Sequence, residues 1–181
     1  MTLLRVFPRP LLTVLLGAGL LTAAGCGKDD DDDPSAAPGD GTVTWTHNGQ
    51  TYTSTTFSSA IVDGSDKIIV TGSSADQKNT VSLALQGINT KGAAAYDLRK
   101  GSVLDNLPVG AITLTSGTTG STYNSLYGPN ASNGTITVTQ YDKAGQKISG
   151  TFSFTAGAVP NSGASGTQGV TNGSFSFTKF R

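Results

Sequence analysis

From residue 41 onward, apolar and polar residues alternate along much of the chain, a period typical of β-strands with one buried face. The clearest case is Gln146–Ala156, where Ile148, Phe152 and Phe154 share one face and serine or threonine occupies most of the other. The pattern predicts further strands over Thr42–His47, Gln50–Ser54, Thr55–Asp63, Lys67–Gly72, Asn79–Gln86, Ala93–Leu98, Ala111–Thr115, Thr122–Tyr127, Thr135–Asp142 and Val170–Phe180.

Turn signals separate these predicted strands. Asn48-Gly49 and Asn133-Gly134 are the dipeptides that most strongly favour a two-residue hairpin turn, because both residues tolerate positive φ. Further turns are predicted at Gly64–Asp66, Asn89–Gly92 and Lys143–Gly145, with loops over Arg99–Gly110 and Gly157–Gly169. Lys67–Gly72 is apolar on both faces, which favours a central or covered strand.

The composition supports strands over helices. Glutamate is absent, and threonine, serine, asparagine and glycine supply most of the polarity. Residues 41–181 are long enough to form one domain with its own core. We therefore predict an all-β fold, a single antiparallel β-sandwich or barrel-like domain over residues 41–181.

The N-terminal region has the layout of a signal peptide over residues 1–25. Arg5 and Arg9 precede the apolar run Leu11–Leu21, which is short for a membrane-spanning helix, and small residues lead to Cys26. This region resembles the lipobox of bacterial lipoproteins, although Ala23 stands where that motif prefers leucine. The resemblance implies cleavage before Cys26 and a lipid on its thiol; the alternative is a stray thiol in an ordinary cleaved signal peptide.

Residues 26–40 are predicted to be a lipidated cysteine followed by a flexible acidic tether. The run Asp29–Asp33 repels itself, and Pro34 and Pro38 favour extended backbone. A cysteine followed by Lys28 and aspartates also resembles the surface-export signal of Bacteroidetes lipoproteins; the alternative is a solvated spacer. These features predict a lipoprotein of the cell envelope, held at the outer membrane and exposed at the cell surface, with the membrane as its partner through the anchor.

Charge argues against nucleic acid as a partner. Charged residues make up only 13% of the chain, and its formal net charge is zero. From residue 41 on, nine basic and six acidic residues are scattered along the sequence. This small excess is too weak for a nucleic-acid surface.

Several segments carry a family resemblance. They are WTHNGQTYTST, AAAYDL, GTITVTQYDKAGQKISGTFSFTA and TNGSFSFTKF. They resemble a family of uncharacterised lipoproteins common in Bacteroidetes and classed as a domain of unknown function. The resemblance implies an all-β secreted domain behind a lipid anchor, and it brings no catalytic residues.

Few residues offer catalytic or metal-binding chemistry. His47 is the only histidine, which makes a zinc site improbable; it leaves a Ser-His-Asp triad open, although no G-x-S-x-G motif is present. A glycosidase-like acid pair would come from Asp63, Asp66, Asp97, Asp105 and Asp142, which serve equally well as turn residues. Asp63 and Asp66 are also a weak calcium candidate without a dedicated motif. We predict no catalytic residue, no metal and no cofactor.

The aromatic residues form a second candidate group. Those considered are Trp45, Tyr52, Tyr96, Tyr123, Tyr127 and Tyr141, which either line a sugar- or peptide-binding face or belong to the core. Tyr123 and Tyr127 lie in a glycine-rich stretch and are the predicted ligand-binding residues.

Together these observations favour a lipid-anchored, non-enzymatic domain that binds or displays a glycan, peptide or protein. One alternative is a hydrolase of an extracellular or envelope polymer, which would bring an aspartate pair, or an aspartate and His47, into one cleft. The other is a structural subunit of a surface assembly, which would leave a long edge strand uncovered.

Overall fold

The computed structural model describes residues 40–181, so the predicted signal peptide, Cys26 and most of the acidic tether lie outside the described residues. Eleven strands dominate: β1 (Gly41–His47), β2 (Gln50–Ser54), β3 (Ser58–Val62), β4 (Lys67–Ser73), β5 (Asn79–Gln86), β6 (Ala95–Arg99), β7 (Val109–Ser116), β8 (Thr119–Asn124), β9 (Ser132–Asp142), β10 (Lys147–Ala158) and β11 (Thr167–Phe177). The helical elements are a single turn, α1 (Ile88–Lys91), and a 3₁₀ turn, η1 (Ser125–Tyr127).

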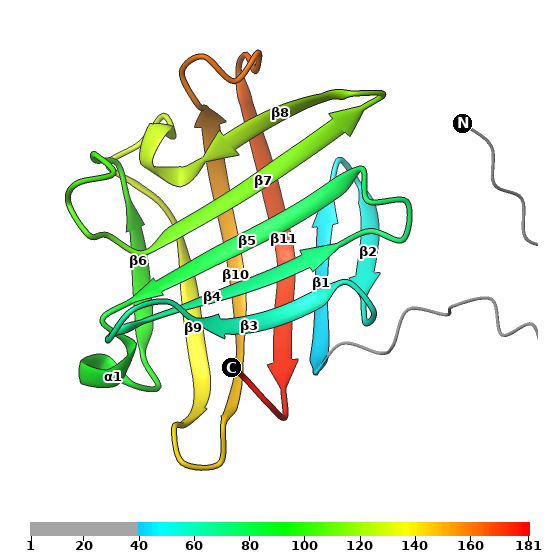
Figure 1. Cartoon of the computed structure of the whole chain (residues 1–181). Coiled ribbons are helices and arrows are strands. Elements are labelled where there is room, and N and C mark those ends of the chain that lie inside the picture. The colour runs from blue at the N-terminus through cyan, green and yellow to red at the C-terminus, as the bar shows by residue number, and fades with distance from the viewer. Residues whose placement is uncertain (1–39) are drawn as a thin grey trace, which may run out of the picture. The chain divides into compact units, whose positions relative to one another are not determined.

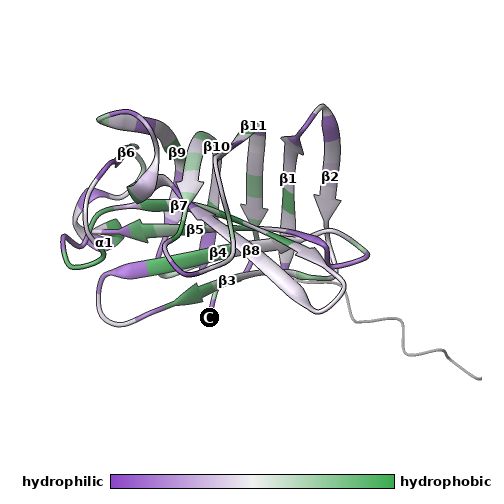
Figure 2. Cartoon of the chain, turned by 90° about the horizontal axis from the view of Figure 1, so that it is seen from above, coloured by the Kyte–Doolittle hydropathy of each residue, from purple (hydrophilic) through white to green (hydrophobic). Residues whose placement is uncertain are grey.

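All strands belong to one antiparallel sheet that folds over into two layers without closing (Figure 1). The six-strand layer has the order β6-β9-β10-β11-β1-β2, and the five-strand layer has the order β8-β7-β5-β4-β3. Strand β10 joins them, because β9 pairs with its first part and β8 pairs with its end at Gly157–Ala158. Figure 2 shows the two layers from above. The predicted all-β, sandwich-like fold is confirmed.

The core lies between the two layers and is built from the predicted apolar faces. In β10, Ile148, Phe152 and Phe154 are buried, and the rings of the two phenylalanines stack with centroids 6.2 Å apart. At the position that faces Phe154, the five-strand layer has a glycine. A Cβ on Gly110 of β7 would lie 2.7 Å from the Phe154 ring, so the absence of a side chain there makes room for phenylalanine.

The two asparagine–glycine dipeptides behave differently. Asn48 and Gly49 form the predicted hairpin turn, with φ values of 50° and 78°. The prediction for Asn133-Gly134 is wrong, because both residues lie inside β9. The Asn133 amide is buried and donates to the backbone carbonyls of Ser125 and Asn130. Gly134 lies so close to β10 that any Cβ would collide with its backbone. Tertiary contacts therefore override the local turn preference.

Smaller corrections follow the same logic. The predicted turn at Asn89–Gly92 is largely the helical turn α1, and the predicted strand Thr122–Tyr127 ends early and continues as η1. In β4, Ile68 and Val70 are buried but Ile69 is only half-buried on the outer side. Strand β4 is therefore central in its layer, but its outer face is not covered.

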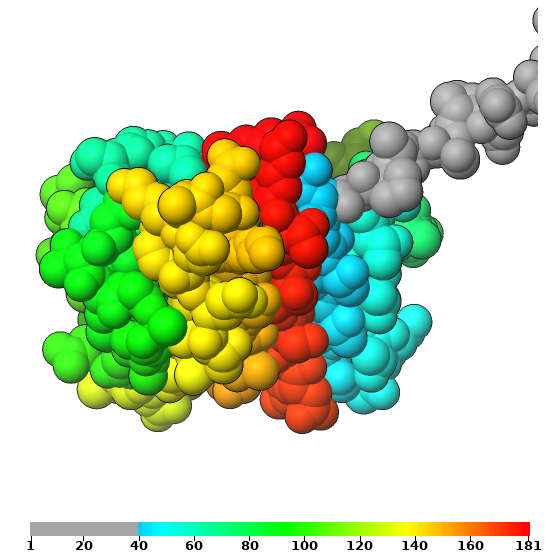
Figure 3. Space-filling model, turned by 90° about the horizontal axis from the view of Figure 1, so that it is seen from below, coloured from blue at the N-terminus to red at the C-terminus, as the bar shows by residue number. Residues whose placement is uncertain are grey.

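The C-terminal residues fold back along β3. The Arg181 backbone N–H donates to the Ala60 carbonyl at 3.0 Å, and the Val62 N–H donates to the Arg181 carbonyl. In Figure 3 the C-terminal residues, in red, lie beside the teal residues of this region. Part of the β3 edge is therefore satisfied by the chain's own backbone.

Candidate binding face

Serine and threonine side chains form two rows across the outer face of the six-strand layer. In the first row, pairing register places them side by side on five successive strands: Thr53, Thr44, Ser174, Thr151 and Thr137. The second row is Thr51, Thr46, Thr171, Ser153 and Thr135. All ten residues are exposed or half-buried. We call these ten residues the hydroxyl face.

The spacing of this face follows from strand geometry. Neighbouring strands lie about 4.8 Å apart, and alternate residues of one strand lie about 6.6–6.8 Å apart. Some hydroxyls bond each other across strands, as Thr46 and Thr51 do at 3.0 Å and Thr44 and Thr53 do at 3.4 Å. Each hydroxyl has one donor and two acceptor positions, so a single such bond leaves capacity for a ligand.

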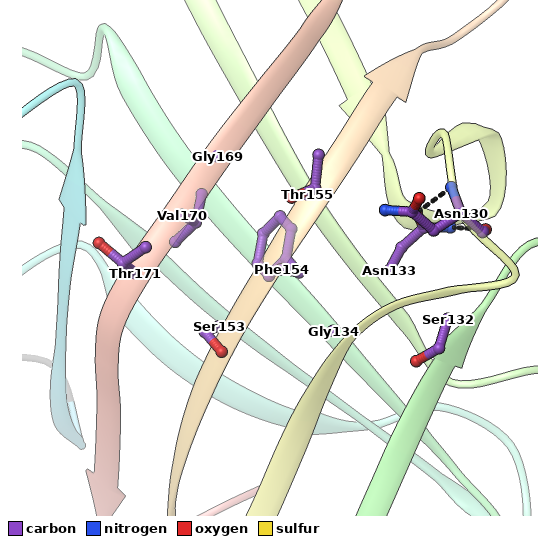
Figure 4. Close-up of a pocket in the computed structure, with 10 residues that line it drawn as sticks. All are labelled: Asn130, Ser132, Asn133, Gly134, Ser153, Phe154, Thr155, Gly169, Val170 and Thr171. Carbon is purple, nitrogen blue, oxygen red and sulfur yellow. Dashed lines mark hydrogen bonds between the residues drawn. The ribbon is translucent and has the colours of Figure 1, made fainter.

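A β-bulge in β11 shapes this surface. Asn172 has a φ of 50°, and the pairing of β11 shifts here against both β1 and β10. Two depressions lie beside the bulge. The first, of about 310 Å³, includes Ser132, Ser153 and Gly169 in its lining (Figure 4). The second, of about 450 Å³, includes Thr137, Thr151, Ser153 and Ser174 in its lining. Ser153 lines both, so the depressions are adjacent.

The only charges placed beside this face by strand pairing lie on β6, among residues 40–181, and they neutralise each other. Asp97 pairs with Thr135, and Arg99 pairs with Ser132. The Ser132 hydroxyl donates to the Asp97 carboxylate, and Arg99 Nε donates to it at 2.9 Å. The hydrogen bond from Ser132 and, with a smaller effect, the hydrogen bond from Arg99 lower the pKa of the Asp97 carboxyl. The border thus holds an ion pair and, beside it, the Lys91 ammonium on the Ala95 carbonyl, whereas the face itself is uncharged.

His47 is held in a buried hydrogen-bonded chain. Trp45 Nε1, which can only donate, donates to Asn79 Oδ1 at 2.9 Å. The Asn79 amide nitrogen must then donate to His47 Nδ1, also at 2.9 Å, and His47 Nε2 donates to Gln168 Oε1 at 2.9 Å. Trp45 therefore fixes the direction of the whole chain, and both nitrogens of the imidazole are occupied by amide groups.

The aspartates considered for catalysis or calcium have local partners. Asp63 forms an ion pair with Lys67, and Asp66 accepts from the Asn89 backbone N–H at 2.6 Å, which ties it to α1. Asp105 and Asp142 accept backbone N–H groups within their own turns. Within residues 40–181, no three histidine, cysteine or acidic side chains are grouped to hold a metal ion.

The aromatic side chains point mostly inward. Tyr123, predicted to bind ligand, is buried in the core, and Tyr127 is half-buried in η1. Burial, followed by the charge of Asp66 and by Tyr141, raises the pKa of Tyr96 to about 12. The Tyr96 hydroxyl donates to the Gly92 carbonyl at 2.7 Å.

The residues of the hydroxyl face were not predicted as a binding site. In the sequence they stand out only as the polar positions of alternating strands. Their alternation was the available signal, but their grouping depends on strand register.

The fold and this face define an all-β, sandwich-like domain with an uncharged polar surface. The chain belongs to the family described as a domain of unknown function, DUF6252, whose sequence model matches residues 40–178. No curated protein and no solved structure matched the chain. In the part of the chain that the structure describes, no helix is long and apolar enough to cross a membrane.

Proposed function

We propose that this protein is a lipid-anchored, non-enzymatic envelope protein that binds a neutral glycan on the hydroxyl face. The observation that carries the proposal is the unbroken row of serine and threonine side chains across five strands, beside two adjacent depressions. A ligand with many hydroxyl groups can both donate to and accept from such a row. An anionic ligand would find no opposite charge within it.

The arrangement of His47 and the aspartates favours binding over hydrolysis. A hydrolase would need a histidine with a free nitrogen beside a nucleophile, or two carboxylates facing a substrate. Both ring nitrogens of His47 instead form hydrogen bonds with side-chain amides. Asp105 and Asp142 accept hydrogen bonds from backbone N–H groups of their own turns.

The edge strands favour a binding domain over a structural subunit. The strands at the free ends of the sheet, β2, β3 and β6, have five residues each, and part of the β3 edge is occupied by the backbone of Arg181. Strand β8, at the end of the five-strand layer, has six residues and pairs with β10 at the last two. Short edges are a common device against strand addition.

The anchor and the location are supported by the sequence, through the residues around Cys26 and the resemblance to Bacteroidetes lipoproteins. We expect Cys26→Ser to abolish incorporation of labelled palmitate and to release the protein from the membrane fraction. Continued labelling would reject the anchor.

Replacing Asp29–Asp33 with a Gly/Ser stretch of equal length tests the export signal. We expect this variant to be lipidated but shielded from protease added to whole cells, whereas unchanged accessibility would leave only the spacer.

The ligand is tested with arrays of neutral glycans, charged glycans and peptides, probed with the purified protein. We expect binding to neutral glycans and its loss in Thr151→Arg, which places a long charged side chain in the first row, between Ser174 and Thr137. Thr119→Arg is the matched control, because Thr119 is an exposed strand threonine on β8. Equal binding by both variants, or binding to peptides alone, would contradict the proposal.

A further inference from the structure

A rigid turn in the loop between β6 and β7 presents two apolar residues to solvent. The turn is Ser102–Asp105, closed by the Asp105 N–H donating to the Ser102 carbonyl at 3.0 Å. The Asp105 carboxylate accepts from the Ser102 N–H at 2.7 Å, and the Leu104 N–H donates to the Ser102 hydroxyl at 3.2 Å. Three hydrogen bonds thus fix the backbone that carries Val103 and Leu104.

These two side chains are the most exposed large apolar groups of residues 40–181. Val103 is 67% exposed and Leu104 is 84% exposed, whereas the next, Ile61, is 50% exposed. Central positions of turns usually carry glycine, proline or polar residues. Two neighbouring aliphatic side chains at the tip of a fixed turn are therefore unfavourable in water and call for a partner.

The loop that carries the tip lies over the outer face of the five-strand layer. Val103 and Leu107 line a small cavity of about 170 Å³ together with Ala84 of β5 and Val109 of β7. Strand pairing continues this apolar line through Ile69 to Ile61. Val103 thus faces this cavity with part of its surface, whereas Leu104 does not line it and remains exposed to solvent.

We propose that Val103 and Leu104 insert into the interfacial region of the bilayer that holds the lipid on Cys26; the inference rests on the anchor in the proposed function. The 13 residues between Cys26 and Asp40 can reach about 45–50 Å when extended, so the tether keeps the tip within range of the membrane. A protein partner would need roughly 800 Å² of surface on this side, which two side chains at a turn do not offer. Shallow insertion requires only such a tip, and the exposed Lys100 nearby suits a headgroup region.

The contact works because it is intramolecular. Even a single myristoyl chain binds membranes only marginally, with an association constant of roughly 10⁴ M⁻¹, and two short side chains bury less apolar surface. Tethering raises the effective concentration of the tip at the bilayer, so a weak contact can be populated. The result would be a domain held in one orientation rather than tumbling on its tether.

The test places an environment-sensitive thiol-reactive dye at position 104. The lipidated full-length product is purified from membranes as Leu104→Cys and reconstituted in vesicles of phosphatidylethanolamine with a minor fraction of phosphatidylglycerol. A lipidated Cys26 is a thioether and does not react, so the new cysteine is the single labelling site. Ala144→Cys, in the exposed turn between β9 and β10, is the matched control.

We expect blue-shifted emission at position 104 and several-fold stronger quenching by nitroxide-bearing lipids than at position 144. In a second pair, dye at Lys100→Cys, an exposed position outside the turn, should lose this quenching when Val103→Ser and Leu104→Ser are added, and retain it with Phe57→Ser, which removes an exposed ring elsewhere. Equal, solution-like emission at 104 and 144 would overturn the inference while leaving the anchor intact. A blue shift at 104 in detergent without vesicles would identify self-association instead and also overturn it. Labelling of the unmodified protein at Cys26 would show that its thiol is free. This result would contradict the lipid anchor and, with it, the inference.

Discussion

The two layers of the sandwich share one core but differ on their outer faces. The inner side of both is apolar, with residues such as Phe154 of β10 and Ile112 of β7 buried. On the outside, the six-strand layer presents the hydroxyl face. The five-strand layer also carries a shorter row of hydroxyl side chains, Ser73, Thr80, Thr113 and Thr122, but combines it with the apolar line from Ile61 to Val109 and the exposed tip at Val103 and Leu104.

This difference separates what folding requires from what it leaves free. The inner residues must exclude water and fill space, so the two inner faces have similar chemistry. The outer residues need only tolerate strand geometry and remain soluble, and charged residues commonly fill that role. Folding does not by itself require an outer face of serine and threonine without charge, or exposed aliphatic groups on the opposite face.

The largest effect on the free energy of unfolding is expected from an inner residue of β10, compared with its outer neighbour on the same strand. Phe152→Ala should lower the free energy of unfolding by roughly 3–5 kcal/mol, because it removes a buried ring and leaves a cavity. Its exposed neighbour, as Ser153→Ala, should change it by no more than about 0.5 kcal/mol. Urea unfolding measures both, and similar values would mean that the assignment of inner and outer faces in β10 is wrong.

The buried amide between the layers should have the next largest effect. Asn79→Leu removes the acceptor for Trp45 and the donor to His47, which leaves two buried polar groups without partners. Each such group costs roughly 1–3 kcal/mol, so a loss of about 2 kcal/mol or more is expected in urea unfolding. Ser82→Ala, on the outer side of the same strand, serves as the control. A neutral Asn79→Leu would show that the chain of hydrogen bonds contributes nothing to stability.

A smaller effect is expected from glycines of β11. A Cβ on Gly173 would lie 2.5 Å from the Phe152 ring, whereas a Cβ on Gly169 would meet nothing within 4 Å. Gly173→Ala should therefore cost roughly 1–3 kcal/mol through overpacking. Gly169→Ala should be close to neutral. Adding Phe152→Leu should recover part of the Gly173→Ala loss in a double-mutant cycle; strictly additive effects would contradict the contact.

The smallest effects on folding should come from the two outer faces. Thr151→Ala on one layer and Ile61→Thr on the other should each change the free energy of unfolding by no more than about 0.5 kcal/mol, as measured by urea denaturation. A loss above about 2 kcal/mol for either would mean that its face has a structural role, and the comparison between the layers would lose its meaning.

Local pattern was a good guide wherever the side-chain period decided the structure. Alternation alone predicts the limits of β5, those of β1 and β10 to within two residues, and the buried positions of Trp45 and Phe154. It failed at Asn133-Gly134, where a strong turn dipeptide lies within a strand because a neighbouring strand and the carbonyls of Ser125 and Asn130 engage it. It also did not show that Tyr123 is buried, because that burial depends on the layer that packs over it.

The sequence by itself determined the class of fold, the strands and the separation of buried from exposed side chains, because a period of two is written in consecutive residues. The tertiary structure alone decided which strands lie side by side. Strand β1 pairs with β11, which lies at the other end of the domain's sequence. Only that pairing brings Thr44 beside Ser174 and Thr151 in one row. Such register depends on contacts between residues far apart in the chain. These contacts cost loop-closure entropy and gain buried surface, and a local sequence pattern contains neither quantity.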